Sequence, residues 1–317
     1  MLQPILSALM PLFALIGLGY ALRCWKVLHH EHVPVLNGLV LDVLLPASIL
    51  KALLQAPALS QKLIVLPVLF WIGDGLIIAA GFLVGRRYGV DRKTLGAMLL
   101  VGAFGNTAFL GYPLGQALLP HQFPATVIID QFGMMPMVYP IAIILSAWCG
   151  AAGGEGIPAA LLRFARGPLF LSIVVAIVLR QITVPVSFAH LPFVASIVGQ
   201  VWQCIIYLSQ ATTPVVLLAL GVVLQPRSDG VSNPLLFLAG LIKLLVLPFL
   251  IWALCRAVGV NGEMRMAAIM QGAMPSAVLT AVLSAQLCMD GRFAARAVFI
   301  TTALSAITLP LIITLLR

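Results

Sequence analysis

Long apolar stretches dominate this chain. Ten of them reach the length of about 20 residues that a helix needs to cross the hydrocarbon core of a membrane. They cover approximately residues 2–22, 34–54, 62–85, 95–118, 124–148, 168–184, 197–224, 234–256, 265–287 and 294–316. Only short polar segments separate them, so we expect an all-α membrane protein of ten transmembrane helices, with no sizeable soluble domain.

Composition agrees with this expectation. Hydrophobic residues make up 62% of the 317 residues and charged residues only 9%, against roughly 25% charged residues in soluble domains. The net charge of +9 comes from Lys and Arg scattered over short loops, without the basic stripe of a nucleic-acid-binding surface. We therefore expect the lipid bilayer, and no nucleic acid, as a partner.

The positions of Lys and Arg predict the orientation in the membrane. Inner loops of membrane proteins carry an excess of these residues. With the N-terminus outside, eleven of the 18 Lys and Arg fall on inner loops and six on outer loops, while Lys243 lies within a span. This distribution predicts that both termini are periplasmic or extracellular.

The fourth apolar stretch contains an interruption. Residues 102–113 read Gly-Ala-Phe-Gly-Asn-Thr-Ala-Phe-Leu-Gly-Tyr-Pro, a run with no ordinary place in a membrane helix. A broken helix exposes backbone groups at several kcal/mol each, unless the loosened backbone lines a cavity enclosed by protein. Many transporters build their substrate sites from such breaks. We therefore predict that this stretch forms half of a substrate site.

The second half of the chain repeats features of the first at an offset of about 170 residues. Gly102-Ala103 falls on Gly272-Ala273, Pro140 on Pro310, and Asp74 on Lys243. Five spans per half is an odd number, so the halves must have opposite topology. We expect a first five-helix repeat over 1–149, a short cytoplasmic connection over 150–167 and a second, inverted repeat over 168–317.

The repeat gives the first interruption a partner in the ninth stretch. Residues 271–276 read Gln-Gly-Ala-Met-Pro-Ser and lie in the middle of that stretch. Two broken helices related by inverted symmetry would cross near the bilayer midplane. Their half-helix N-termini would then present partial positive charge and free N–H groups to an anion.

At these residues the chain resembles the auxin efflux carrier superfamily, which includes the plant PIN-formed carriers and bacterial permeases for small organic acids. The matching pieces are Leu36-Asn37 through Leu45-Pro46, Asn106-Thr107 with Gly111-Tyr112-Pro113, Thr213-Pro214 with Leu220-Gly221, Lys243 through Pro248, and Gln271 through Pro275. The resemblance covers nearly the whole chain. It implies two inverted five-helix repeats with broken, crossing helices four and nine, similar to bile-acid and sodium/proton antiporter folds. It also implies that a transport domain moves against a scaffold, with substrate beside the crossover.

One departure from the plant carriers is informative. Those carriers often have a long hydrophilic loop between helices five and six, whereas only residues 150–167 lie there in this chain. A bacterial inner-membrane carrier for an organic acid therefore fits better than a plant hormone carrier.

Polar residues near the two interruptions are the candidate substrate ligands. Asn106 and Thr107 would bind a carboxylate, or alternatively satisfy carbonyl groups of the broken helix itself. Gln131 occupies a position similar to a substrate-lining residue of the relatives, and Gln271 and Ser276 are the counterparts in the ninth stretch. The residues that we expect to shape the crossover are Gly105, Gly111, Pro113 and Pro275.

Charged residues inside spans are candidates for coupling or support. A carboxylate at the depth of Asp74 costs about 2.5–3.5 kcal/mol on insertion scales and is a functional hypothesis by default. Asp74 either couples transport to protons or cations, or belongs to a fixed ion pair, and Lys243 faces the same choice. As equivalents in opposite halves, the two need not touch. Lys51 either extends to the outer interface or approaches Asp74. Asp130 lies beside Gln131 in the fifth span and could equally face the outer vestibule, so the sequence assigns it no role.

The expected function is secondary transport of a small mono- or dicarboxylate, such as malonate or malate, by alternating access. The alternatives are an efflux carrier for an auxin-like amphipathic acid, and an uncoupled channel or sensor with the same fold. We expect no enzyme, because no Walker loop, metalloprotease motif or Ser-His-Asp set occurs. No cofactor or metal is expected, since the five cysteines are dispersed. A homodimer is left open.

Overall fold

Helices make up the described part of this computed structural model. The structure describes residues 2–55, 61–149, 159, 162, 165–181, 192–223 and 234–316. Most of the predicted connection 150–167 therefore lies outside the described residues, as do positions 182–184 of the sixth predicted span. The described residues contain no named strand, in agreement with the all-α prediction.

The helices follow the predicted apolar stretches closely. The first half of the chain forms α1 (Leu2–Cys24), η1 (His30–His32), α2 (Val33–Leu39), η2 (Val40–Leu44), α3 (Leu45–Gln55), α4 (Gln61–Arg87), α5 (Arg92–Ala103), α6 (Gly111–Leu118), η3 (Pro120–Gln122), α7 (Phe123–Ile128), η4 (Ile129–Met134) and α8 (Met135–Trp148). The second half forms α10 (Pro168–Gln181), α12 (Pro192–Val223), α13 (Pro234–Leu241), η5 (Ile242–Val246), α14 (Leu247–Ala257), α15 (Gly262–Gly272), α16 (Val278–Gln286) and α17 (Gly291–Leu315).

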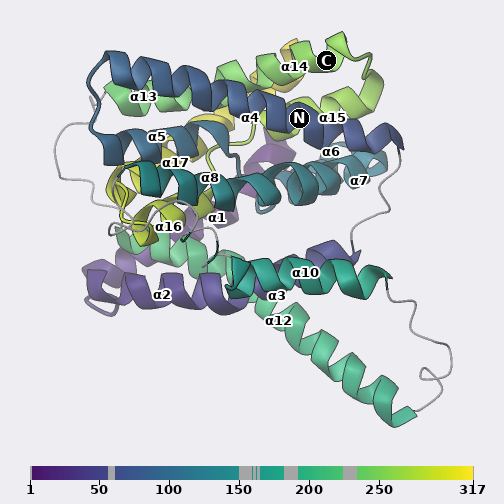
Figure 1. Cartoon of the computed structure of the whole chain (residues 1–317). Coiled ribbons are helices and arrows are strands. Elements are labelled where there is room, and N and C mark those ends of the chain that lie inside the picture. The colour runs from purple at the N-terminus through teal and green to yellow at the C-terminus, as the bar shows by residue number, and fades with distance from the viewer. Residues whose placement is uncertain are drawn as a thin grey trace.

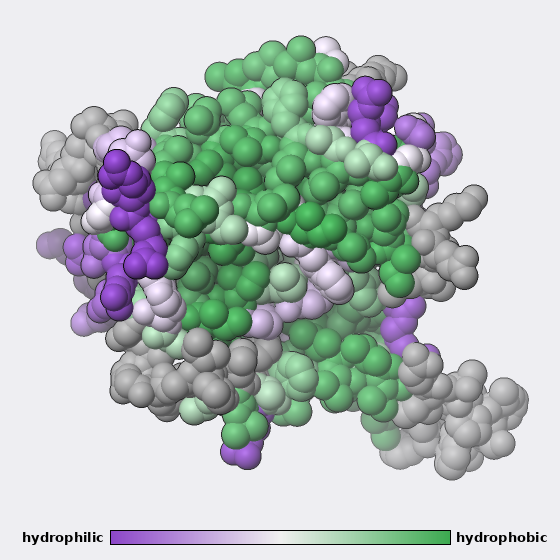
Figure 2. All heavy atoms as spheres, turned by 45° about the horizontal axis from the view of Figure 1, so that its top comes forward, coloured by the Kyte–Doolittle hydropathy of each residue, from purple (hydrophilic) through white to green (hydrophobic). Residues whose placement is uncertain are grey.

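Six helical segments of the described chain are long and apolar enough to cross a membrane. They are Val33–Gln55, Leu63–Arg87, Pro120–Trp148, Ser196–Val222, Pro234–Ala257 and Gly291–Leu315. Two further apolar helices are shorter, Met10–Cys24 and Pro168–Arg180. Figure 2 shows a largely hydrophobic face with hydrophilic residues gathered toward its edges, as expected for a protein whose middle contacts lipid.

The fourth and ninth predicted stretches are not continuous helices. Each consists of two short helices, α5 with α6 and α15 with α16, separated by non-helical residues at 104–110 and 273–277. Neither half is long enough to span a membrane by itself. The sequence therefore located both interruptions correctly.

Three long helices contain a π-helical turn, and a proline explains each one. Leu45, Met135 and Leu247 follow the turns directly, and each donates its N–H to the carbonyl five residues earlier. The next residue is in each case a proline, which has no N–H for the carbonyl four residues before it and collides with that carbonyl. The extra residue of the π turn accommodates this collision, and π turns are frequent at functional sites.

The helices form two groups (Figure 1). One group contains α1, α2, α3, α10 and α12, in which α1 packs on α12 and both α10 and α12 pack on α3. The other contains the interrupted helices, with α4 packed on α5 and α14, and α17 on α16. The cavity described below lies where the two groups meet.

Candidate functional site

The two interruptions meet in space. Gly105 and Ser276 form an antiparallel bridge, flanked by hydrogen bonds from Asn106 N–H to the Pro275 carbonyl (2.7 Å) and from Ala277 N–H to the Phe104 carbonyl (3.0 Å). Each broken backbone thus supplies partners for the other, which removes part of the free-energy cost of breaking a helix within the membrane. The predicted crossover of the fourth and ninth stretches is present in the structure.

Glycines permit this close approach. A Cβ atom at Gly105 would lie 2.9 Å from Nζ of Lys243 and 3.3 Å from the Met274 carbonyl oxygen. A Cβ atom at Gly111 would lie 3.0 Å from Cδ of Gln271 and closer still to its Oε1. Both positions fit the predicted role in shaping the crossover, and Pro275 contributes the carbonyl that Asn106 binds. Pro113 is the third residue of α6.

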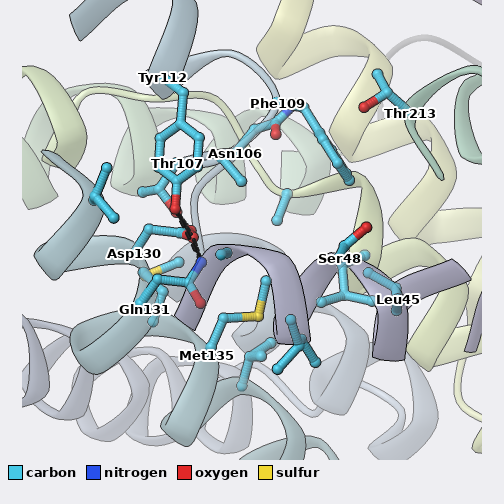
Figure 3. A pocket seen from close by; sticks show the side chains of 18 of the residues that line it. Leu45, Ser48, Asn106, Thr107, Phe109, Tyr112, Asp130, Gln131, Met135 and Thr213 are labelled. Atoms are coloured by element: carbon cyan, nitrogen blue, oxygen red, sulfur yellow. Dashed lines mark hydrogen bonds between the residues drawn. The ribbon is translucent and has the colours of Figure 1, made fainter. Parts of the chain in front are cut away.

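A cavity of about 430 Å³ opens beside the crossover. Its walls come from α3 and α12 on one side, and from residues 104–109, α6, η4 and the start of α16 on the other. Figure 3 shows Ser48, Leu45 and Thr213 on one side of this space and the group around Asp130 on the other. Its size falls within the range of roughly 300–1,000 Å³ found for small-molecule sites.

The structure separates the roles of Asn106 and Thr107. Both line the cavity and both are buried, at 3% and 2% exposure. The side-chain amide of Asn106 makes no hydrogen bond to any described residue and is open to the cavity. The Thr107 hydroxyl, by contrast, donates to the Asp130 carboxylate at 2.5 Å. Asn106 is therefore free to bind a ligand, whereas Thr107 is held by a neighbouring side chain.

Gln271 and Ser276 lie behind the crossover and do not line this cavity. The Gln271 amide donates to the carbonyls of Thr107 (3.3 Å) and Thr126 (3.1 Å), and the Ser276 hydroxyl donates to the Val101 carbonyl (2.6 Å). In this conformation they hold the crossover together. Their predicted contact with substrate stays a prediction.

The two half-helix N-termini differ in what they offer. Val278 and Leu279 line the cavity at the start of α16, where the first N–H groups of a helix have no partner inside it. At the start of α6, the N–H groups of Leu110 and Gly111 both bind the Asn106 carbonyl. Only α16 therefore matches the predicted presentation of free N–H groups, because local bonds occupy those of α6.

Asp130 is the lining residue that the sequence reading left without a role. It is 1% exposed and accepts hydrogen bonds from the Thr107 hydroxyl, the Tyr112 hydroxyl (2.6 Å) and the Gln131 amide (2.6 Å) (Figure 3). The Gln131 amide also donates to the Tyr112 oxygen (2.9 Å). Its position inside an apolar span was a signal of function that the sequence already contained.

Asp74 and Lys243 lie close enough for their charges to interact, yet no hydrogen bond or salt bridge joins these two described residues, as expected for residues that need not touch. Asp74 is 0% exposed, and neither carboxylate oxygen has a hydrogen-bond partner in the described chain. The Lys243 ammonium donates to the Gly272 carbonyl (3.0 Å) at the C-terminus of α15, where the helix dipole favours a cation. The Lys243 ammonium therefore lies directly beside the crossover.

Lys51 does not pair with Asp74. It lines the cavity from α3 and makes no hydrogen bond or ion pair with any described residue. It therefore places a positive charge on the cavity wall opposite the crossover.

A possible set of metal ligands lies away from the cavity. His29, Glu31 and His32, before α2, place one ligand atom each within 4.8 Å of one another. All three are wholly or partly exposed, and Nδ1 of His32 already accepts the His29 N–H at 3.1 Å. No residue of this group lines the cavity.

Comparison with known proteins agrees with this geometry. A family described as membrane transport protein matches the chain over residues 4–151 and 157–313. The chain belongs to the membrane transport protein family. This membership confirms the resemblance to the auxin efflux carrier superfamily and makes the protein an integral membrane transporter by family.

Two archaeal proteins resemble this membrane transport protein over almost their whole length. An uncharacterized transporter of Methanocaldococcus jannaschii is 25% identical over 301 residues, which cover 94% of each chain. An uncharacterized transporter of Methanothermobacter thermautotrophicus is 26% identical over 306 residues, which cover 96% of each chain. Neither name specifies a substrate.

Proposed function

We propose that this protein is a secondary transporter that moves a small organic acid anion, a mono- or dicarboxylate such as malonate or malate, by alternating access. The observation that supports the proposal most is the open side-chain amide of Asn106, which faces a cavity where two broken helices meet. Family membership supports transport as the activity. The chemistry of the cavity supports an anion as the cargo.

Three groups favour a carboxylate in this cavity. The Asn106 amide provides N–H donors, the start of α16 provides backbone N–H groups with partial positive charge, and Lys51 provides an ammonium group. The crossover and Lys51 belong to opposite walls. A dicarboxylate could therefore bind one carboxylate at the crossover and the other at Lys51.

The cavity also favours one alternative substrate, a larger amphipathic acid of auxin type. Many of its lining side chains are apolar, among them Ile49, Phe109, Phe123 and Val138. Such walls would accommodate a ring or a hydrocarbon body while the crossover binds the carboxylate. Comparing malonate with an arylacetic acid as competitors would discriminate between the two substrates.

Alternating access requires one group of helices to move relative to the other. We propose ten transmembrane helices in two inverted repeats, with both termini outside the inner membrane of a bacterium. Two pairs of features about 170 residues apart support the repeat. The breaks at 104–110 and 273–277 meet, and Gly89 and Gly259 both adopt positive φ, at 65° and 75°. Asp74 and Lys243 would support the crossover during the movement.

Uptake into liposomes tests the proposal. Wild-type protein should take up labelled malonate or malate with saturation and trans-stimulation, whereas linear flux would favour a channel. A hydrogen bond to a charged group contributes about 1.5–3 kcal/mol, so Asn106→Ala should weaken apparent affinity by about 10- to 100-fold. Asn261→Ala is the matched control, because Asn261 is exposed in the turn before α15. Equal affinity in the Asn106→Ala variant and the wild type would refute the site.

A further inference from the structure

Asp130 is a buried carboxylate that neutral groups hold in place. Its three hydrogen bonds come from a hydroxyl of the crossover, a hydroxyl of α6 and the neighbouring amide in η4. No described Lys, Arg or His forms a hydrogen bond or ion pair with it. Burying a carboxylate without a cation is unfavourable, and such groups in membrane spans commonly exchange protons.

The titratable and charged groups around Asp130 are few. Tyr112 of α6 donates to it, and Tyr139 of α8 lies close enough for its hydroxyl to interact with the carboxylate charge. On α4, which packs against η4, the charged residue Asp74 interacts with Lys243 instead. Lys51 is the cavity-lining cation among the described residues. Among the described lining residues, Asp130 is thus the carboxylic acid, separate from Asp74 and Lys243.

The hydrogen-bond partners of Asp130 can accommodate a proton on its carboxylate. Gln131 directs its amide nitrogen toward the carboxylate, while its Oε1 is buried without a hydrogen-bond partner (Figure 3). Rotation of this amide by half a turn would present Oε1 to a protonated Asp130 as an acceptor. The same rotation would turn N–H donors toward Met135, another lining residue. Gln131 can therefore donate to the ionised Asp130 and accept from the protonated Asp130.

We propose that Asp130 binds the proton that is transported together with the substrate anion, and that Gln131 rotates to accept that proton. The inference rests on the proposed function, and it assigns the coupling ion. Protonation neutralises the negative charge of the cavity wall before an anion occupies the cavity. The rotated Gln131 amide then accepts the proton of Asp130 through Oε1. One proton is taken up for each anion bound, and both are released on the other side.

Coulomb's law predicts strong coupling between protonation of Asp130 and binding of the anion. Two like charges a few ångströms apart, at an effective dielectric constant of about 20, repel enough to change an affinity by about tenfold or more. By linkage, the anion favours protonation of Asp130 by the same factor by which the proton favours the anion. Thr107 joins this carboxylate to the crossover, so the proton also acts on the segment that contains Asn106.

Malonate binding to the purified, detergent-solubilised protein tests the inference. In the wild type, affinity should fall at least tenfold between pH 6.5 and pH 8.5, and a pH-sensitive dye in weak buffer should report proton uptake on binding. Asp130→Asn should bind with affinity that changes far less over this range, and without proton uptake. The titration of malonate itself is the same for both proteins. Asp130→Glu, which keeps the carboxylate, should retain the pH dependence.

The outcomes separate the two proposals. Saturable malonate binding by wild-type protein, with neither proton uptake nor a difference in pH dependence from Asp130→Asn, would overturn the role of Asp130 and leave the transport proposal intact. Absence of binding of malonate, malate and an arylacetic acid to wild-type protein would overturn both. Absence of proton uptake by the wild type would overturn the role of Asp130 even if the Asp130→Asn variant failed to fold.

Discussion

The contact between Gly111 and Gln271 gives the sharpest test of how the crossover is held. A Cβ atom at position 111 would overlap the Gln271 side chain, whose amide donates to two backbone carbonyls, one in the crossover and one in α7. Gln271 is fully buried, at 0% exposure. In the Gly111→Ala variant, this side chain must either stay and be compressed or move and lose both bonds.

Either outcome would lower the free energy of unfolding by a similar amount. Overpacking a buried site costs about 1–3 kcal/mol. Losing two buried hydrogen bonds costs about 0.5–1.5 kcal/mol each. In a helix, alanine is more favourable than glycine by up to about 1 kcal/mol. At Gly111, the first residue of α6, this gain offsets part of the lost stability. We therefore expect the Gly111→Ala variant to be destabilised by about 1–2 kcal/mol.

Thermal unfolding in detergent measures this effect, with Gly75→Ala as the matched control. Gly75 lies inside α4, and a Cβ atom there would meet nothing within 4 Å. The control should melt at or above the wild-type temperature, whereas Gly111→Ala should melt a few degrees lower.

A double-mutant cycle identifies the cause. In a Gln271→Ala background the overlapping side chain is absent, so the further change Gly111→Ala should cost close to nothing. If Gly111→Ala melts like the Gly75→Ala control, or destabilises equally in both backgrounds, the proposed overlap with Gln271 is wrong.

Three further predictions concern charges and a thiol. Lys51→Gln should weaken malonate binding at least fivefold more than binding of a monocarboxylate, because only malonate has a second carboxylate for Lys51. Competition assays that show equal losses of affinity for both acids would exclude Lys51 as the ligand of the second carboxylate. Lys243→Met should lower stability by about 1.5–3 kcal/mol, since it removes the charged hydrogen bond to the Gly272 carbonyl and the cation that interacts with the buried Asp74 charge. Adding Asp74→Asn should restore part of this stability in thermal melts. Burial raises the pKa of the Cys149 thiol to about 11, so maleimide at pH 7 should label it at least tenfold more slowly than the exposed Cys288, as mass spectrometry would show. Equal labelling rates would contradict that burial.

Much of the helical organisation could be predicted from the sequence. Burying the backbone of a membrane segment requires helices of about 20 apolar residues, so their positions follow directly from the apolar stretches. The interruptions were equally visible, because Gly, Pro and paired polar residues have no other place in such a segment. The helix boundaries agree with the predicted ones to within a few residues at most places, apart from the breaks.

The roles of individual polar side chains could not be predicted in the same way. Asn106 and Thr107 are adjacent and chemically similar, yet one is open to the cavity and the other is bound to Asp130. Gln271 has the composition of a substrate ligand and instead connects the crossover to α7. These differences depend on which partners lie opposite, and local sequence does not contain that information.

The sequence by itself determined that this protein is an all-helical membrane transporter by family, with two helices broken at its centre. Only the tertiary structure shows that Asp130 lines the cavity and that the charge of Lys243 interacts with the charge of Asp74. Both Asp130 and Lys243 lie in π turns, which change the helical register so that a 3.6-residue period no longer gives the direction of a side chain. The length of an apolar stretch is a local property, which follows from the sequence of that segment alone. The cavity, by contrast, exists only where segments more than 100 residues apart pack together.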